Sequence, residues 1–246
     1  HITREDLIAS TSLSIEDGGF LRYAERGTGH IYEIDLQGGV EKRVSGNTVG
    51  KVIDAVFSPD GNSAILIKES SSGNSSAVWL TYGATSEQDS ILPENSSNFH
   101  FTADSGLLFT VSTQGETTGY EQSNINQPTK ELWQIPLNDV DIKWSSSSTL
   151  VINKTSSMLK GGVYEVANGQ LSQVVAPGYS FSAVISDDGH QILYSFFDTG
   201  LKARVSYILD TETAETITAV FPAVPEKCGV LATKFLCATS GAFQTL

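Results

Sequence analysis

The sequence has no hydrophobic run that could cross a membrane as a helix. Such a helix needs about 20 consecutive apolar residues, and no stretch of the 246 residues approaches that length. Basic residues are also scarce, because 15 Lys and Arg stand against 28 Asp and Glu, which gives a net charge of -13. So negative a surface repels phosphate groups, which argues against binding to nucleic acid or to anionic lipid.

Motifs for catalysis and cofactor binding are missing as well. The sequence has no G-x-S-x-G nucleophile elbow, no P-loop and no dinucleotide-binding fingerprint. The four histidines are dispersed without a metal-binding spacing, and Asp139-Val140-Asp141 supplies only two of the clustered oxygen ligands that a calcium loop needs. We therefore expect no enzyme activity, no cofactor and no metal ion.

What the sequence does contain is a repeated turn. Turn signals flanked by alternating apolar residues occur at Glu16-Asp17-Gly18-Gly19, Ser58-Pro59-Asp60-Gly61, Ala103-Asp104-Ser105-Gly106, 145–148 and Ser186-Asp187-Asp188-Gly189, and more weakly at Ala232-Thr233. Successive turns are about 41–45 residues apart, which is the length of one four-stranded propeller blade. The aspartates recur at one place in this repeat, which favours a role in stabilising the turn over a role in catalysis.

The repeat predicts an all-β fold, a β-propeller of four-stranded antiparallel blades in a single domain over residues 1–246. In each repeat one strand leads into the turn, a second leaves it and two more follow, with β-type alternation along the strands. The expected blades cover residues 7–46, 51–92, 97–137, 139–176 and 179–220, and a partial sixth blade of two strands covers 225–246. Two strands leave an open edge, so either residues are missing after Leu246, or the N-terminal tail or a neighbouring subunit donates a strand.

Cys228 and Cys237 are the only two cysteines. If Ala232-Thr233 form a two-residue hairpin loop, Leu231 pairs with Lys234. Counting back from that pair places Cys228 opposite Cys237, where Cα atoms approach to roughly 4.5 Å and a disulfide can form. We expect a cross-strand disulfide and hence an exported protein; the alternative is a pair of small buried side chains in a reducing compartment.

The longest polar stretch between expected strands, residues 113–130, is a candidate binding face. The stretches 70–76 and 156–161 occupy the equivalent connection in neighbouring repeats, and such connections project from one face of a propeller. Tyr120 and Tyr82 are candidate anchors, because Tyr contributes rigid contact area at interfaces. The candidate binding residues are Tyr82, Tyr120, Asn124 and Asn126. Solvated loops without a partner are the alternative for each of them.

Two repeats carry a family resemblance. Val56-Phe57-Ser58-Pro59-Asp60-Gly61-Asn62 resembles the TolB-like and WD-like propeller repeat, which has an F-S-P-D-G turn between its first two strands. The segment 184–194, with Ser186-Asp187-Asp188-Gly189 at its centre, is a second good match. The other repeats match in spacing only.

Segments near both ends resemble a family of exported bacterial propeller proteins to which no activity is assigned. The resemblance rests on Arg22-Tyr23-Ala24-Glu25-Arg26 with Gly29-His30-Ile31-Tyr32-Glu33, and on Pro225-Glu226-Lys227-Cys228 with Leu236-Cys237-Ala238. The chain departs from that family at Gly229-Val230, where an aromatic residue is usual. The resemblance implies export and further blades after Leu246. The start at His1, without a signal-peptide pattern, fits either a processed form or a piece of a longer protein.

Three functions remain open at this point. The leading one is a non-catalytic extracellular or cell-envelope module for interaction or assembly, with a protein partner or with self-association through the incomplete last blade. The second is the binding of a carbohydrate or another small ligand at the propeller mouth. The third is the propeller domain of a hydrolase whose catalytic part is absent from this chain.

Overall fold

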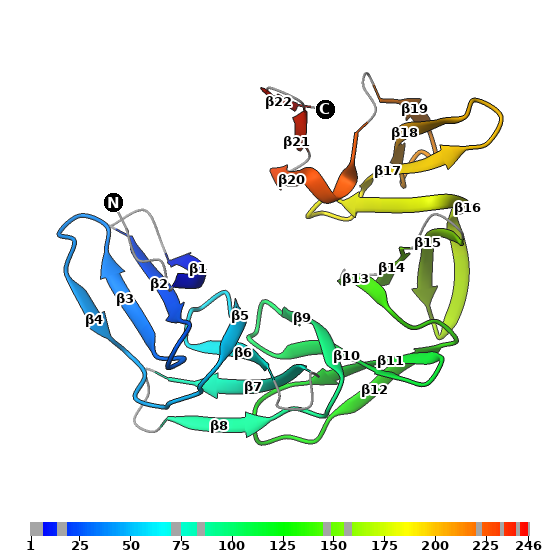
Figure 1. The fold of residues 1–246 in the computed structure, drawn as a ribbon. Helices are drawn as coiled ribbons and strands as arrows, with labels where there is room; N and C mark the ends of the chain where they lie inside the picture. The colour runs from blue at the N-terminus through cyan, green and yellow to red at the C-terminus, as the bar shows by residue number, and fades with distance from the viewer. Residues whose placement is uncertain are drawn as a thin grey trace. The chain divides into compact units, whose positions relative to one another are not determined.

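The computed structural model describes residues 7–13, 19–69, 75–82, 87–144, 149–154, 159–219, 223–231, 234–239 and 242–245. The chain divides into two compact units, His1–Leu132 (unit 1) and Trp133–Leu246 (unit 2). Within the described ranges the regular structure is β-strand, apart from one short 3-10 turn at Pro225–Lys227 (Figure 1). The turns expected around Asp17, at 145–148 and at Ala232-Thr233 fall outside the described residues.

Unit 1 is built from four-stranded antiparallel sheets in which every strand pairs with its neighbour in sequence. The strands are β1 (Leu7–Leu13), β2 (Phe20–Glu25), β3 (Ile31–Asp35) and β4 (Glu41–Arg43); β5 (Val52–Phe57), β6 (Ser63–Glu69), β7 (Ser75–Thr81) and β8 (Gln88–Ile91); and β9 (Ser96–Phe101), β10 (Leu107–Thr113), β11 (Glu116–Gln122) and β12 (Lys130–Ile135). The division between the two units falls within β12. The four-stranded antiparallel sheets expected from the repeat are therefore present.

Unit 2 contains a seven-stranded sheet and a three-stranded sheet. The first is formed by β13 (Val140–Trp144), β14 (Thr149–Asn153), β15 (Lys160–Ala167), β16 (Gln170–Ile185), β17 (Gln191–Asp198), β18 (Ala203–Asp210) and β19 (Thr216–Thr218), and the second by β20 (Cys228–Leu231), β21 (Lys234–Thr239) and β22 (Ala242–Thr245). All the strands again follow sequence order.

The long strand β16 differs from the expectation of two separate strands, one ending at Val175 and the next beginning at Tyr179. Its first part pairs with β15 and its second part pairs with β17, so that Tyr179 lies opposite Lys160 on one side and Phe197 on the other. The pairing register shifts between Tyr179 and Ser182. A bulge of this kind bends a strand without ending it. The single strand β16 therefore belongs to two successive sets of four strands, β13–β16 and β16–β19.

The last sheet also differs from expectation, because two strands were predicted after residue 225 and the structure has three. The additional strand, β22, pairs with β21 and places Phe243 opposite Ala238. Its four residues alternate apolar and polar side chains, which is a signal too short to distinguish from a loop in the sequence alone. The expectation of a two-stranded sixth unit was wrong.

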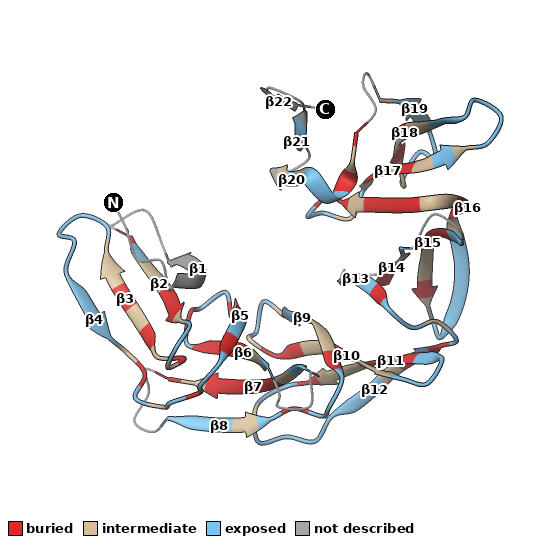
Figure 2. Cartoon of the chain, viewed as in Figure 1, coloured by how far each residue is buried: buried red, intermediate tan, exposed pale blue. Residues whose placement is uncertain are grey.

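The core lies between the middle strands of successive sheets, and the short outer strands are exposed (Figure 2). Adjacent residues of β6 face opposite ways: Leu66 packs with Ala24 and Ile31 of the first sheet, whereas Ile65 packs with residues of the third. Sheet β5–β8 is thus covered on both faces. In unit 2, one cluster joins β14 to β18, and Leu193 joins another that contains Phe235 and Cys237.

Candidate functional site

The repeated turns use their aspartates to bind backbone. In the turn at Asp60, one carboxylate oxygen accepts hydrogen bonds from the Asn62 N–H at 3.0 Å and from the Ser58 hydroxyl at 2.6 Å. The Ser58 Oγ in turn accepts the Ser63 N–H at 2.9 Å. Burial would raise the pKa of Asp60, but the hydrogen bonds outweigh it and hold that pKa below its ordinary value.

The turn at Asp188 repeats this arrangement in unit 2. Its carboxylate accepts the Ser186 hydroxyl and the His190 N–H, and the Ser186 Oγ accepts the Gln191 N–H at 2.9 Å. The Ser186 hydroxyl, followed by the His190 N–H, lowers the pKa of Asp188. The two aspartates are therefore committed to turns, as the repeat predicts.

The turn at Asp104 is one residue shorter and uses a different group. Here the Thr102 Oγ1 accepts the Gly106 N–H at 3.0 Å, while the Thr102 N–H donates to the Gly106 carbonyl at 2.8 Å. Ser105 takes the left-handed backbone conformation, with φ of 60°, that Gly61 takes in the turn at Asp60, with φ of 69°. At this turn the Thr102 hydroxyl oxygen therefore accepts the backbone N–H that a serine hydroxyl oxygen accepts in the turns at Asp60 and Asp188.

Tyr82 is not an exposed anchor, which corrects the sequence-based expectation. It follows β7 directly and is only 2% exposed, in the cluster between the first two sheets. The Arg22 guanidinium lies over its ring, 5.7 Å from the centroid. Burial raises the pKa of Tyr82, and the positive charge of Arg22 opposes that rise only in part.

The polar stretch 113–130 is not one connection. It contains β11, whose Tyr120 lies opposite Phe109 on β10 and stacks on it with ring centroids 5.6 Å apart. Tyr120 is partly buried against the cluster between the second and third sheets, so it too is mainly a packing residue. The stretch therefore consists of two shorter connections on either side of β11.

Asn124 and Asn126 are exposed on the connection between β11 and β12. The Asn126 backbone N–H donates to the Asn124 Oδ1 at 3.0 Å, and its side-chain amide donates to the Gln88 Oε1 of the second sheet at 2.9 Å. In an antiparallel sheet the first and third connections lie at one end and the second at the other. The two asparagines therefore lie at the end of their own sheet opposite to the β10–β11 connection. Residues 70–74 and 156–158 of the other two stretches fall outside the described residues.

The disulfide has the predicted register. Leu231 lies opposite Lys234, Cys228 lies opposite Cys237, and their sulfur atoms are bonded with the Cα atoms 4.0 Å apart. The bond closes the β20–β21 hairpin directly after the 3-10 turn Pro225–Lys227. That turn is thereby attached to a cross-linked hairpin.

Unit 1 contains a buried charge cluster that was not predicted from the sequence. Glu33, with its side chain 6% exposed, pairs with Arg22 at 2.7 Å and with Lys42 at 2.8 Å, and Arg22 also donates to the Gly61 carbonyl of the next sheet. Burial acts to raise the pKa of Glu33, but hydrogen bonds from Lys42 and Arg22 and their charges lower it below its ordinary value. The three residues are direct cross-strand partners, so aligning the expected strands would have revealed the cluster.

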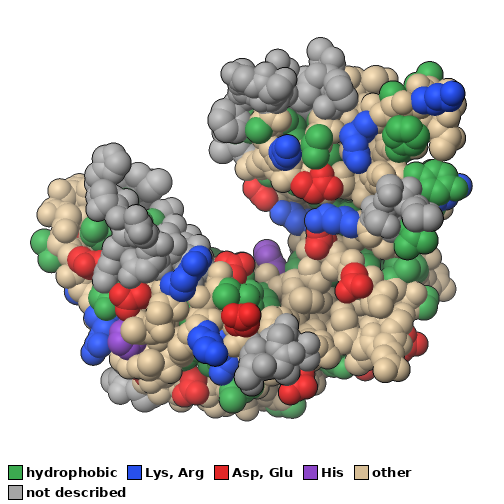
Figure 3. Space-filling model, in the orientation of Figure 1, with side chains coloured by type: hydrophobic (Ala, Val, Ile, Leu, Met, Phe, Trp, Pro, Cys, Tyr) green, Lys and Arg blue, Asp and Glu red, His purple; other side chains and the backbone are tan. Residues whose placement is uncertain are grey.

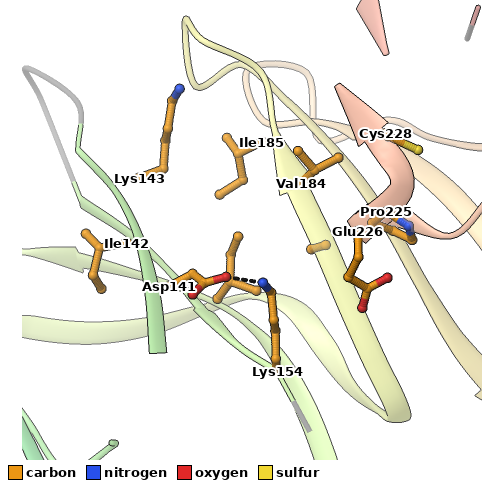
Figure 4. Close-up of a pocket in the computed structure, with 11 residues that line it drawn as sticks. Asp141, Ile142, Lys143, Lys154, Val184, Ile185, Pro225, Glu226 and Cys228 are labelled. Carbon is orange, nitrogen blue, oxygen red and sulfur yellow. Dashed lines mark ion pairs between the residues drawn. The ribbon is translucent and has the colours of Figure 1, made fainter. Parts of the chain in front are cut away.

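Unit 2 has a pocket of about 300 Å³ beside the first strands of its sheets (Figure 4). Its lining combines residues of β13, β14, β16 and the Pro225–Lys227 turn. The apolar part includes Ile152, Ala183 and Ile185, all buried. Asp141 and Lys154 form an ion pair on one side, and Glu226 lies across the pocket from them.

Unit 2 also exposes aromatic and basic side chains together. Lys160, Tyr179, Phe197 and Arg204 are successive cross-strand partners from β15 to β18, and so form one row across the sheet. The Lys160 Nζ lies 5.1 Å from the centre of the Tyr179 ring. Figure 3 shows hydrophobic and basic side chains gathered over this part of the sheet. The β15–β18 patch is defined as Lys160, Tyr179, Phe197, Leu201, Lys202 and Arg204.

Two features are absent from the described part of the chain. It contains no group of three or more His, Cys, Asp or Glu residues arranged to hold a metal ion. None of its helical structure is long and apolar enough to cross a bilayer.

The sequence matches no protein family and no curated protein, whereas the structure matches known β-propellers. The β-propeller domain of the Trilobed protease from Pyrococcus furiosus aligns with a TM-score of 0.64 at 15% identity, over 98% of this chain and 82% of that one. TolB from Acinetobacter baumannii aligns with a TM-score of 0.50 at 11% identity, over 92% of this chain and 75% of that one.

A peptidase is similar over part of its length. The Pyrococcus horikoshii acylaminoacyl peptidase aligns with a TM-score of 0.62 at 13% identity, over 97% of this chain and 44% of its own. This chain therefore spans less than half the length of that enzyme. At these identities the comparisons establish the fold, and the resemblance to TolB-like propellers is confirmed at that level.

Proposed function

We propose that this chain is a non-catalytic interaction module of an exported protein, and that its β15–β18 patch docks an acidic polypeptide segment of a partner protein. The observation that carries the proposal is the exposure of large apolar side chains on strands β15–β18 and a turn that also carry Lys160, Lys202 and Arg204. Phe197 is 40% exposed and Leu201 is 68% exposed. Exposed apolar groups that lie together are typical of interaction sites.

Charge supports an acidic partner. The chain carries a net charge of -13, yet Lys160, Lys202 and Arg204 all belong to the patch. The Arg204 guanidinium is held by a hydrogen bond to the Ser195 Oγ at 2.6 Å, which fixes part of this positive surface. Complementary charges accelerate association and exclude partners of the wrong sign, so the basic patch selects a negatively charged segment.

The aromatic row supports a polypeptide with apolar side chains. The Tyr179 ring lies 5.1 Å from the Lys160 Nζ, and the backbone of Tyr179 lies opposite that of Phe197. Aromatic residues and arginine contribute most of the energy at protein interfaces. Leu201 extends the apolar surface into the β17–β18 turn, where the Asp198 carboxylate accepts the Leu201 N–H at 2.9 Å. The backbone that carries the patch is therefore paired or hydrogen-bonded before a partner binds.

Export is part of the proposal and is supported by the disulfide. Paired cysteines persist in oxidising compartments and are rare in the cytosol, and both cysteines of this chain are paired. Chemical labelling of thiols in native material tests this point, because two reactive thiols would contradict it.

The docking experiment uses short labelled peptides and fluorescence anisotropy. One peptide alternates Glu with Leu, a second alternates Glu with Ser, and a third alternates Lys with Leu. We expect the Glu–Leu peptide to bind most tightly, with an affinity that falls as salt is added. A double variant, Phe197→Ser with Leu201→Ser, should lower the affinity for the Glu–Leu peptide about ten-fold.

The matched control is Ile217→Ser, which removes an apolar side chain 60% exposed on β19, outside the patch. It should leave the affinity unchanged. Equal binding of the Lys–Leu peptide, or equal loss in the control, would overturn the proposal. Self-association in sedimentation velocity that the double variant abolishes would assign the patch to a contact between copies of this chain instead.

The peptidase similarity favours a second candidate, the propeller domain of a hydrolase. The chain aligns over nearly its full length with part of the acylaminoacyl peptidase. Labelling of the natural full-length protein with a fluorophosphonate, which reacts with activated serines, would support this candidate. Absence of labelling, with a gene that encodes no nucleophile elbow, would remove it.

A further inference from the structure

The pocket beside β13 and β16 is lined by two basic and two acidic side chains, Lys143 and Lys154 with Asp141 and Glu226. Asp141 is paired with Lys154, and Lys143 is paired with Asp187 at 2.9 Å. Within the described part of the chain, no basic group pairs with the Glu226 carboxylate. Among the described residues, Glu226 is therefore the charged lining residue without an ion pair, and its carboxylate can pair with a cation.

The rest of the pocket is apolar. Buried Ile152, Ala183 and Ile185 line it together with Val184 and Pro225. Binding sites for small molecules usually combine an apolar wall with a few placed polar groups, and their volumes run from about 300 to 1,000 Å³. A pocket of about 300 Å³ lies at the small end of that range and accommodates one compact apolar group.

The backbone that carries Glu226 is held in a hydrogen-bonded turn. It lies in the 3-10 turn Pro225–Lys227, where the Lys227 N–H donates to the Val224 carbonyl at 2.8 Å. The next residue, Cys228, is bonded to Cys237 and also lines the pocket. The backbone at Glu226 is therefore ordered before a ligand binds, and only the side chain loses freedom on binding.

We propose that this pocket binds small organic cations in which a primary ammonium group is attached to a branched apolar or aromatic body. The ammonium pairs with the Glu226 carboxylate, and the body packs on Ile152, Val184 and Ile185. The site is separate from the β15–β18 patch in residues and in chemistry, and it stands whether or not the patch docks a partner.

Three probes with the same branched body test the charge requirement. Leucine amide carries a positive charge, leucine is zwitterionic, and 4-methylpentanoate is negative. Each is titrated into isotope-labelled protein at neutral pH, and binding is followed by amide chemical shifts. Leucine amide should shift signals from 183–185 and from 225–228 and should saturate, whereas 4-methylpentanoate should bind at least about ten-fold more weakly. Equal affinities, or shifts confined to other regions, would overturn the proposal.

The Glu226→Gln variant tests the assigned residue. The side chain is exposed, so the change should leave the melting temperature unaltered. The variant should lower the affinity for leucine amide about five-fold, a typical loss for one partly exposed charge pair. It should also bind the cation no more tightly than the other two probes. The control is Glu215→Gln, which neutralises an exposed carboxylate of unit 2 that does not line the pocket. Retained cation preference in Glu226→Gln, or an equal loss in the control, would refute the assignment.

Discussion

The two units connect neighbouring sheets by different means. In unit 1, side chains make the connection: Arg22 of the first sheet donates to the Gly61 carbonyl of the second, and Asn126 beside the third donates to Gln88 of the second at 2.9 Å. In unit 2 the main chain makes it, because β16 completes one set of four strands and begins the next. The same repeat can thus be joined by polar side chains or by an uninterrupted strand.

The difference determines where each unit is sensitive to substitution. A side-chain connection depends on a few polar residues and on their ionisation. A main-chain connection depends on the space around the backbone where the strand bends. Substitutions of these polar residues, and of residues at the strand bend, should therefore show how much each kind of connection contributes to stability.

The largest effect is expected at Arg22. Arg22→Met leaves the buried Glu33 with Lys42 alone and removes the donor to the Gly61 carbonyl, so the free energy of unfolding should fall by about 3 kcal/mol. Urea denaturation measures the loss. Lys42→Met is the matched control, since Lys42 pairs with the same carboxylate but is 65% exposed, and it should cost less than about 1 kcal/mol. Similar losses in both variants would show that the connection to the second sheet contributes little.

An intermediate effect is expected at Gly178, on the bend of β16. A Cβ at this position would lie 2.6 Å from the Cβ and Cγ atoms of Phe196, which packs against the core of unit 2. Gly178→Ala should therefore cost about 2 kcal/mol through overpacking. Gly229→Ala is the control in β20, where no atom lies within 4 Å of the added Cβ, and it should change stability by less than about 0.5 kcal/mol. Thermal unfolding measures both losses. A larger loss in Gly229→Ala than in Gly178→Ala would contradict this account of the bend.

The parts of the fold that follow local patterns were predictable from the sequence. Turn spacing and alternation indicated the four-stranded sheets, and a two-residue loop fixed the register of Cys228 and Cys237. β22 was missed because four alternating residues are a weak signal. β16 was divided because its continuity depends on a bulge, which has no reliable pattern in the sequence.

The candidate sites were harder to predict because exposure depends on how sheets pack. Tyr82 follows a strand and resembles a loop anchor, yet Arg22 of another sheet covers it. Lys160, Tyr179 and Phe197 come from different strands and meet only through their pairing register. The charge cluster at Glu33 could have been predicted from the sequence, since its partners are cross-strand neighbours.

The smallest effect is expected at the repeated turns, where the two units use the same chemistry. Asp60→Asn in unit 1 and Asp188→Asn in unit 2 should each cost roughly 1 kcal/mol at neutral pH, because each weakens hydrogen bonds to a serine hydroxyl and a backbone N–H. Asp104→Asn is the control and should cost less, since Thr102 accepts the backbone N–H in that turn. Equal losses at all of these positions would contradict the assignment.

The dependence on pH distinguishes the ionised carboxylates from a general loss of turn stability. The pKa values of Asp60 and Asp188 lie below the ordinary value of 3.8, so both carboxylates stabilise the fold above that pH. Their contribution is lost as the pH falls through the lowered pKa of the folded state. Between neutral pH and about pH 3, the wild type should therefore lose more stability than either Asn variant. Urea denaturation at several pH values measures this, and parallel curves for wild type and variants would mean that neutral side chains hold these turns equally well.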